Sequence, residues 1–211
     1  EVRRASCVVG PLGLVPPVLL TGSGAQQFAA EQCNMRVDPA CHFTESSRMR
    51  WSEYRGRLDG VSRTVGQDWD IFSDTVGAVC FDVRGRFAAA VSSGGNWLKA
   101  SGRVGAAAVP GAASTALQSI AVAASGNGER MIRSSFALRI AMCLTSESDD
   151  VDFDAVRRLA VDSEAGMIAL RHHDNGKVEL LFVHATPSFS IGYFCPASMP
   201  APSAKVSLCP G

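Results

Sequence analysis

The sequence predicts an α+β fold in which helices pack on a largely antiparallel sheet. Short β-compatible runs occur near the middle and the end of the chain, and two helical segments lie between them. Glycine or Asn-Gly turns separate neighbouring runs, which is typical of antiparallel hairpins. With 211 residues and 46% hydrophobic residues, the chain can bury a core of its own. We therefore expect one domain with helices layered over strands.

The first third of the chain predicts a strand, a helix and a connector. Residues 15–20 form a short apolar run, and residues 21–33 follow as a glycine turn and a helix. Residues 44–73 become polar and arginine-rich without a clear period, which predicts an exposed connector. Gly22 and Gly24 lack the lysine or third glycine of a nucleotide-binding loop, so we expect no nucleotide there.

The rest of the chain predicts two hairpins with two helices between them. The first hairpin joins residues 78–83 and 87–92 through Gly85, and the second joins residues 167–172 and 178–184 through Asn175 and Gly176. The remaining elements are a strand at residues 119–124, helices at residues 128–144 and 152–164, and a strand at residues 191–195. Paired helices should therefore cover the strands.

Composition argues against several classes of function. Twenty basic and twenty acidic residues leave no net charge, so neither nucleic acid nor an anionic membrane is an expected partner. The apolar stretch at residues 11–20 is shorter than the roughly 20 residues of a membrane span, and it lacks a signal-peptide pattern. We expect a cytoplasmic or nuclear protein. Seven scattered cysteines without a paired spacing argue against a zinc site and against a full disulfide framework. We expect no metal and no cofactor.

Three motifs follow one another in the central part of the chain. Residues 74–95 read DTVGAVCFDVRGRFAAAVSSGG and place a threonine at the mouth of a rigid hairpin. Residues 102–112 read GRVGAAAVPGA, and residues 124–133 read ASGNGERMIR. These motifs resemble the nucleophile strand, substrate loop and oxyanion segment of the asparaginase-like N-terminal nucleophile (Ntn) hydrolases. SSGG, SGNGE and VHATPSFSIGYF, residues 183–194, resemble the threonine aspartase (taspase) branch of that family.

The resemblance implies a fold and a processing event. The expected fold is a four-layer αββα sandwich of the Ntn-hydrolase type, incomplete at the N-terminus because no HGGAG-type turn is present. Residues 1–74 would be the C-terminal part of an α-subunit with its linker, and residues 75–211 a β-subunit, together forming one domain. Self-cleavage between Asp74 and Thr75 would yield an α/β heterodimer, and these heterodimers could pair in turn.

The resemblance also assigns the nucleophile and its neighbour. Once Thr75 begins a new chain, its α-amine, with a pKa of about 7.7 to 8, can take the hydroxyl proton without a histidine. Ser93 matches the position whose hydroxyl bonds to the nucleophile. We therefore expect catalysis by the Thr75 hydroxyl, supported by Ser93.

The other family positions concern charge on the substrate. Ser125 and the backbone N–H of Gly126 match the pair that stabilises the oxyanion. Arg103 matches the arginine that binds a substrate carboxylate, for which a planar guanidinium is suited. Gly95 and Gly128 are the further positions expected to bind substrate.

One departure from the pattern bears on specificity. Asparaginases carry an aspartate three residues after the arginine, where it pairs with the substrate α-ammonium, but this chain has Ala106. We therefore predict a threonine-type endopeptidase that cuts protein or peptide substrates after Asp, because an internal residue has no ammonium to satisfy. The alternatives are an isoaspartyl peptidase or L-asparaginase, and a truncated non-catalytic homologue that acts as a binding or dimerisation module.

Overall fold

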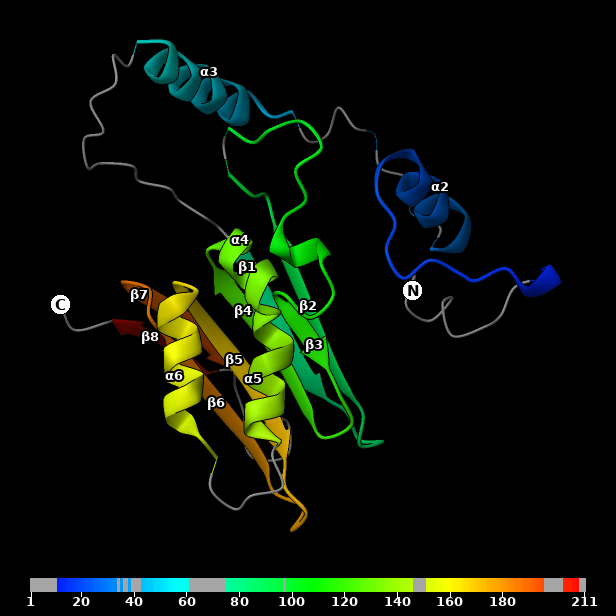
Figure 1. The fold of residues 1–211 in the computed structure, drawn as a ribbon, viewed down its shortest axis with the longest axis vertical. Helices are drawn as coiled ribbons and strands as arrows, with labels where there is room; N and C mark the ends of the chain where they lie inside the picture. The colour runs from blue at the N-terminus through cyan, green and yellow to red at the C-terminus, as the bar shows by residue number, and fades with distance from the viewer. Residues whose placement is uncertain are drawn as a thin grey trace. The chain divides into compact units, whose positions relative to one another are not determined.

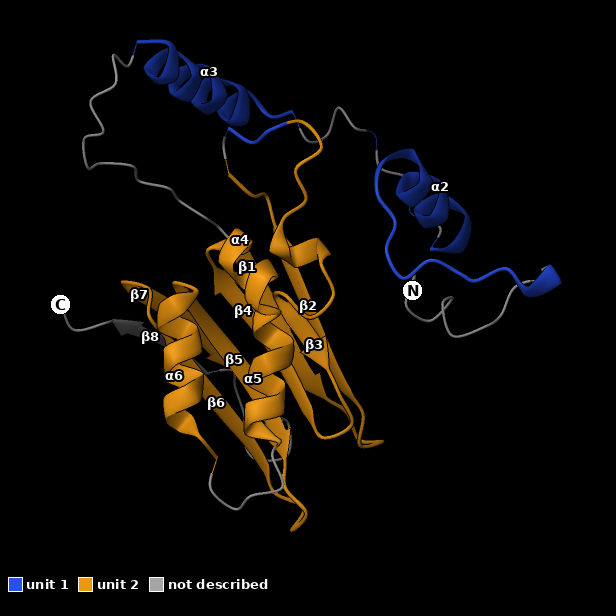
Figure 2. Ribbon diagram, in the orientation of Figure 1, with its two compact units in different colours: residues 1–69, 97–100 blue, residues 70–96, 101–211 orange. Residues whose placement is uncertain are grey.

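The protein is described by a computed structural model that covers residues 11–33, 35, 38, 43–60, 75–96, 98–145, 151–195 and 203–208. The chain divides into two compact units (Figure 2), residues 1–69 with 97–100 and residues 70–96 with 101–211. The described residues of the predicted active site all belong to the second unit.

The regular elements in the described part of the first unit are helices. It contains η1 (Pro11–Gly13), α2 (Gly22–Gln32) and α3 (Glu45–Gly60). α2 confirms the expected helix, but the strand expected at residues 15–20 is wrong, since the backbone there is irregular. Pro16 and Pro17 explain the difference because each removes an N–H that a sheet ladder needs. No helix in the described ranges is long and apolar enough to cross a membrane.

α3 replaces the first half of the expected connector. The helix buries none of its residues. At its start, the Thr44 hydroxyl oxygen accepts a hydrogen bond from the Ser47 N–H at 3.1 Å, and ion pairs at four-residue spacing support its length. These pairs are Glu53–Arg57 at 2.6 Å and Arg55–Asp59 at 3.1 Å. The sequence lacks an apolar period here, so the helix was missed; residues 61–73 of the connector lie outside the described residues.

The second unit is built on a four-stranded antiparallel sheet in the order β3-β4-β5-β6. The strands are β3 (Ser114–Ala116), β4 (Ile120–Gly126), β5 (Ala165–His172) and β6 (Val178–His184). The β5–β6 hairpin is confirmed, and its turn holds Gly176 at φ +83° while the Lys177 N–H donates to the Asn175 side chain at 3.0 Å. β3, only three residues long, was not predicted.

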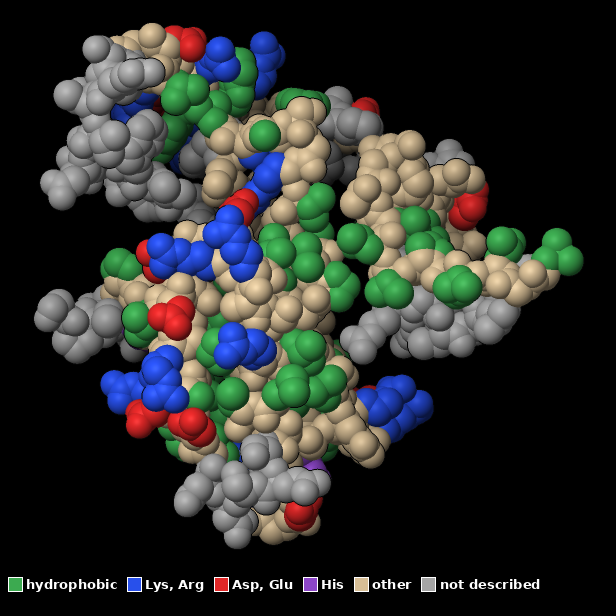
Figure 3. Space-filling view, in the orientation of Figure 1, with side chains coloured by type: hydrophobic (Ala, Val, Ile, Leu, Met, Phe, Trp, Pro, Cys, Tyr) green, Lys and Arg blue, Asp and Glu red, His purple; other side chains and the backbone are tan. Residues whose placement is uncertain are grey.

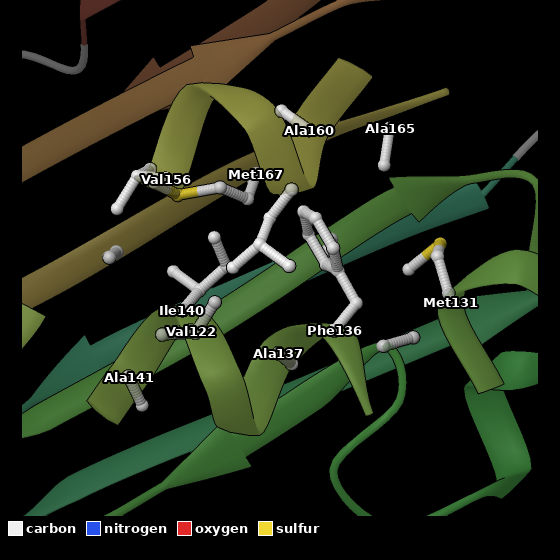
Figure 4. Close-up of a cluster of buried hydrophobic side chains, with 14 of the residues drawn as sticks. Val122, Met131, Phe136, Ala137, Ile140, Ala141, Val156, Ala160, Ala165 and Met167 are labelled. Atoms are coloured by element: carbon white, nitrogen blue, oxygen red, sulfur yellow. The ribbon is translucent and has the colours of Figure 1, made fainter. Parts of the chain in front are cut away.

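Helices cover one face of this sheet (Figure 1). α6 (Phe153–Asp162) confirms its prediction and begins at Asp152, whose carboxylate accepts from the Ala155 N–H at 2.8 Å. Figure 4 shows side chains of α5 (Phe136–Leu144) pointing into a cluster with Val156 and Met167. The buried α5 residues follow the helical period: Phe136, Ala137, Ile140, Ala141 and Leu144.

The single helix expected at residues 128–144 is two helices. Ser135, at φ +48°, separates α4 (Gly128–Ser134) from α5. The first N–H groups of α5 bond to a loop instead of to the preceding turn. The bonds are Ala137 N–H to the Ala112 carbonyl at 3.1 Å and Leu138 N–H to the Gly111 carbonyl at 3.0 Å. This loop satisfies donors that helix starts leave unpaired, which permits the break.

Two hairpins lie over the opposite face of the sheet. They are β1 (Thr75–Phe81) with β2 (Phe87–Ser93), as predicted, and β7 (Ser188–Tyr193) with β8 (Ser203–Leu208). β7 is the expected strand, shifted by a few residues, and β8 was not predicted. Because side chains alternate along a strand, the Ala123 side chain points toward β1. A Cβ added to Gly77 of β1 would lie 3.0 Å from the Ala123 methyl group. Small residues therefore allow β1 to approach β4 closely.

The prediction of a mixed α+β fold is confirmed. The described residues of the second unit form a helix layer, the four-stranded sheet and a layer of hairpins. The complete four-layer sandwich remains a prediction.

On the face in Figure 3, basic and acidic side chains lie next to one another over α4 and α6.

Candidate active site

Thr75 and Ser93 face each other at the end of the β1–β2 hairpin. They are register partners, and the Thr75 hydroxyl donates a hydrogen bond to Ser93 Oγ over 3.1 Å. The same Ser93 oxygen accepts from the Gly95 N–H at 3.1 Å. Gly95 has a φ of +71°, which glycine adopts without strain. The turn after β2 thus holds the Ser93 hydroxyl beside that of Thr75.

A cavity of about 390 Å³ lies beside this hydroxyl pair. Its lining takes Thr75, Val76 and Gly77 from β1 and residues 188–192 from β7. The C-terminal end of β4, which includes Ser125, and Ile168 of β5 supply the rest. Two hydroxyl-bearing residues that are fifty positions apart therefore share one cavity, whose volume suits a small ligand.

The segment after Ser125 is fixed by close packing. A Cβ on Gly126 would lie 2.5 Å from both Ala165 Cα and the Glu164 carbonyl oxygen, so only glycine fits. The Asn127 N–H donates to the carbonyls of Ser163 and Glu164 at 3.3 Å each. Glu164 itself has a φ of +46°. The α6–β5 turn therefore holds the expected oxyanion segment in place.

Arg103 is held by a carboxylate of its own chain. Its Nε donates to Glu129 Oε1 at 2.9 Å and its Nη2 donates to Oε2 at 3.0 Å. The Arg103 side chain is 18% exposed and that of Glu129 50%. These hydrogen bonds from Arg103 hold the pKa of Glu129 below its ordinary value of 4.5.

Two glycines make room for the guanidinium. A Cβ on Gly105 would lie 3.0 Å from Arg103 Nη1, and one on Gly128 would lie 3.1 Å from Nη2. A side chain at Gly105 or Gly128 would therefore come too close to the Arg103 guanidinium. Gly128 thus lies next to the Arg103 guanidinium, and its role in substrate binding remains a prediction.

The predicted site residues form two groups in the structure. Thr75 and Ser93 are hydrogen-bonded, and Ser125 shares their cavity. Arg103 lies against Gly128, at the start of the helix that follows the oxyanion segment. Asp74 lies outside the described residues. The catalytic and binding roles of all these residues remain predictions.

Glu129 is the functional candidate that sequence reasoning missed. It occupies the first turn of α4, where acidic residues are common for electrostatic reasons alone. Its partner stands 26 positions earlier in the chain. No local pattern could connect the two.

Among the described residues, no group of three or more His, Cys, Asp or Glu side chains could hold a metal ion.

Comparisons with known proteins agree with the motifs. Residues 12–185 match the Asparaginase_2 family, described as asparaginase. An isoaspartyl peptidase of Salmonella typhimurium is 34% identical over 168 residues, 76% of this chain and 54% of that protein. A plant-type L-asparaginase of Pyrobaculum calidifontis is 38% identical over 123 residues, 58% of this chain and 38% of that protein. An isoaspartyl peptidase/L-asparaginase of Rattus norvegicus is 31% identical over 169 residues, 76% of this chain and 49% of that protein.

The chain spans about half, or less, of the length of these relatives. Their names agree with the isoaspartyl peptidase or L-asparaginase alternative better than with the threonine aspartase prediction. The family match covers most of the chain and includes both the hydroxyl pair and the Arg103 site. The chain therefore belongs to the Asparaginase_2 family, within the Ntn-hydrolase superfamily.

Proposed function

We propose that this chain forms part of a β-aspartyl amide hydrolase, an isoaspartyl peptidase or L-asparaginase that uses Thr75 as its nucleophile. The observation that carries the proposal is the 3.1 Å hydrogen bond between the Thr75 and Ser93 hydroxyls at the edge of a cavity. Relatives named isoaspartyl peptidase that are 32 to 34% identical support this substrate class.

Activation requires a free α-amine on Thr75. Attack of the Thr75 hydroxyl on the Asp74 carbonyl carbon converts the peptide bond into an ester. Water then hydrolyses this ester and leaves Thr75 as the first residue of a new chain. Its α-amine, with a pKa of about 7.7 to 8, is neutral in part at physiological pH and can act as a general base.

Hydrolysis of the substrate repeats this chemistry. The α-amine takes the proton of the Thr75 hydroxyl, whose oxygen attacks the β-carbonyl carbon of the aspartyl group. Ser125 and the Gly126 N–H stabilise the oxyanion, and the amine leaves with a proton. Water then cleaves the acyl ester and releases aspartate. Ser93 orients the hydroxyl, while Arg103 binds the α-carboxylate.

A threonine aspartase-like endopeptidase is the second candidate. The specific observation in its favour is Ala106, which stands where asparaginases have the carboxylate for the substrate ammonium. In this case the side chain of an internal Asp would bind Arg103. The main-chain carbonyl of that same Asp would then meet Thr75.

Two measurements test these functions. Intact mass spectrometry should find a fragment that begins at Thr75, and Thr75→Ala should abolish it. The processed protein should then hydrolyse an isoaspartyl dipeptide or L-asparagine and leave a peptide with an internal Asp intact. Cleavage of the internal peptide alone would favour the endopeptidase. Turnover of none of the three by processed protein would contradict both candidates and support the non-catalytic alternative.

A further inference from the structure

The Arg103 guanidinium has two edges that can each grip a carboxylate, and one is occupied. Glu129 takes the edge formed by Nε and Nη2. The second edge, formed by Nη1 and Nη2, meets Glu129 only through the shared Nη2, and within the described part of the chain Nη1 has no polar partner. A planar guanidinium can therefore bind a second carboxylate at that edge without losing the first.

Two glycines lie next to the nitrogens that form this second edge. Gly105 is next to Nη1 and Gly128 next to Nη2, and a Cβ at either position would approach the nitrogen to 3.0 or 3.1 Å. Because both positions lack a side chain, neither presses on these nitrogens. The burial of most of the Arg103 side chain fixes the direction in which the edge points, because only 18% of it is exposed.

Charge decides which ligand suits this edge. Arg103 and Glu129 neutralise one another, so a ligand that brings only a carboxylate leaves one uncompensated negative charge. Two carboxylates on adjacent edges of one guanidinium also repel each other. An ammonium on the carbon next to the ligand carboxylate can lie beside Glu129. Its positive charge then compensates the extra negative charge and reduces the repulsion between the two carboxylates. Half of the Glu129 side chain is exposed and open to such a contact.

One further cation faces Glu129. Arg133 lies one turn further along α4 and contributes to the low pKa of Glu129, but its effect ranks below the hydrogen bond from Arg103. Arg133 is exposed, so water screens its charge. No ion pair between Arg133 and Glu129 occurs within the described residues. The Glu129 side chain is thus half-exposed, and within the described residues only Arg103 forms an ion pair with it.

We propose that Glu129 binds the α-ammonium of the substrate, in place of the aspartate that Ala106 replaces. The Arg103–Glu129 pair is then a receptor for the α-carboxylate and α-ammonium of one amino acid. This inference rests on the proposed function for the identity of that amino acid, an aspartyl group attacked at its β-carbonyl. It makes Glu129 a specificity-determining residue that selects free aspartyl ends over internal Asp.

Binding of two related ligands tests the inference without requiring turnover. L-Aspartate, the expected product, carries the α-ammonium, and N-acetyl-L-aspartate lacks it. Isothermal titration calorimetry on the full chain should give a Kd for L-aspartate roughly 10-fold or more below that for N-acetyl-L-aspartate. Glu129→Gln keeps the size of the side chain and removes its charge, and it should bring the two Kd values close together.

Matched variants separate this role from a loss of folding. Asp162→Asn removes an exposed carboxylate from α6 and should keep the preference for L-aspartate. Arg103→Lys keeps the positive charge but loses the planar edge, so it should weaken both ligands. Thermal unfolding of each variant checks that it is folded.

Three results would overturn the inference: equal Kd values in the wild type, a preference that survives in Glu129→Gln, or failure of L-aspartate to bind. Turnover of an isoaspartyl dipeptide is measured separately. Processed protein that binds as expected but hydrolyses no β-aspartyl substrate would contradict the proposed function and leave the Glu129 inference standing. Turnover of a β-aspartyl substrate without a preference for L-aspartate would support the proposed function and contradict the Glu129 inference.

Discussion

The hydroxyl of Thr75, the first residue of β1, donates to the hydroxyl of Ser93, the last residue of β2, over 3.1 Å. Hairpin register alone brings the two together, because Thr75 and Ser93 are paired across the strands. The contact therefore forms within one hairpin, whereas the neighbours of Arg103 come from a loop and a helix start.

Ser93→Ala should slow Thr75-dependent turnover. The substitution removes the acceptor for the Thr75 hydroxyl, a net loss of about 0.5 to 1.5 kcal/mol, or roughly 2- to 10-fold in kcat/KM. Steady-state kinetics on an isoaspartyl dipeptide would measure it. Ser92→Ala is the matched control, because Ser92 is exposed and its side chain points to the other face of the strand. Equal rates for both variants would remove Ser93 from the mechanism.

Gly126→Ala should destabilise the second unit. The new methyl group would overlap the Glu164 carbonyl oxygen and Ala165 at 2.5 to 2.6 Å, and forced movement of this kind costs about 1 to 3 kcal/mol. Gly24→Ala is the control, since nothing lies within 4 Å of its Cβ position in α2. Chemical denaturation should show a loss for the first variant alone. A fully stable Gly126→Ala protein would contradict the packing described for the oxyanion segment.

Glu129→Gln should alter the pH dependence of stability. The folded-state pKa of Glu129 lies below 4.5 because Arg103 donates hydrogen bonds to it. Ionised Glu129 therefore stabilises the fold above that pH, and the contribution is lost as the pH falls through the folded-state pKa. The wild type should exceed the variant in free energy of unfolding at neutral pH, by a small amount because the pair is partly exposed. The difference should vanish in acid, and a constant difference would refute the linkage.

Phe136→Ala should remove a large part of the stability of the helix layer. The Phe136 side chain is fully buried between α5 and the sheet, and truncation of such a residue costs about 3 to 5 kcal/mol. Leu138→Ala, in the same helix, should cost much less because Leu138 is 36% exposed. Thermal unfolding of the two variants checks the orientation of α5. Similar losses would show that this helix presents another face to the core.

Local pattern predicted much of the second unit correctly. The β5–β6 hairpin depends on Asn175 and Gly176, and Gly176 has the positive φ that this turn demands. The Thr75–Ser93 contact was also expected, because a resemblance to a family with a known nucleophile strand named both residues. The first unit was predicted less well, since α3 depends on ion pairs rather than on an apolar face.

The sequence by itself determined the β1–β2 and β5–β6 hairpins, the strands β4 and β7, the presence of helix between them, and the family. These depend on turn chemistry, periodicity and motifs that lie within short stretches of chain. Only the tertiary structure decided that Ser135 divides a helix, that Gly126 packs against the α6–β5 turn, and that Glu129 holds Arg103. Each of these depends on contacts between segments far apart in the sequence. The free energy of such contacts comes from packing and charge pairing in space, which no local pattern encodes.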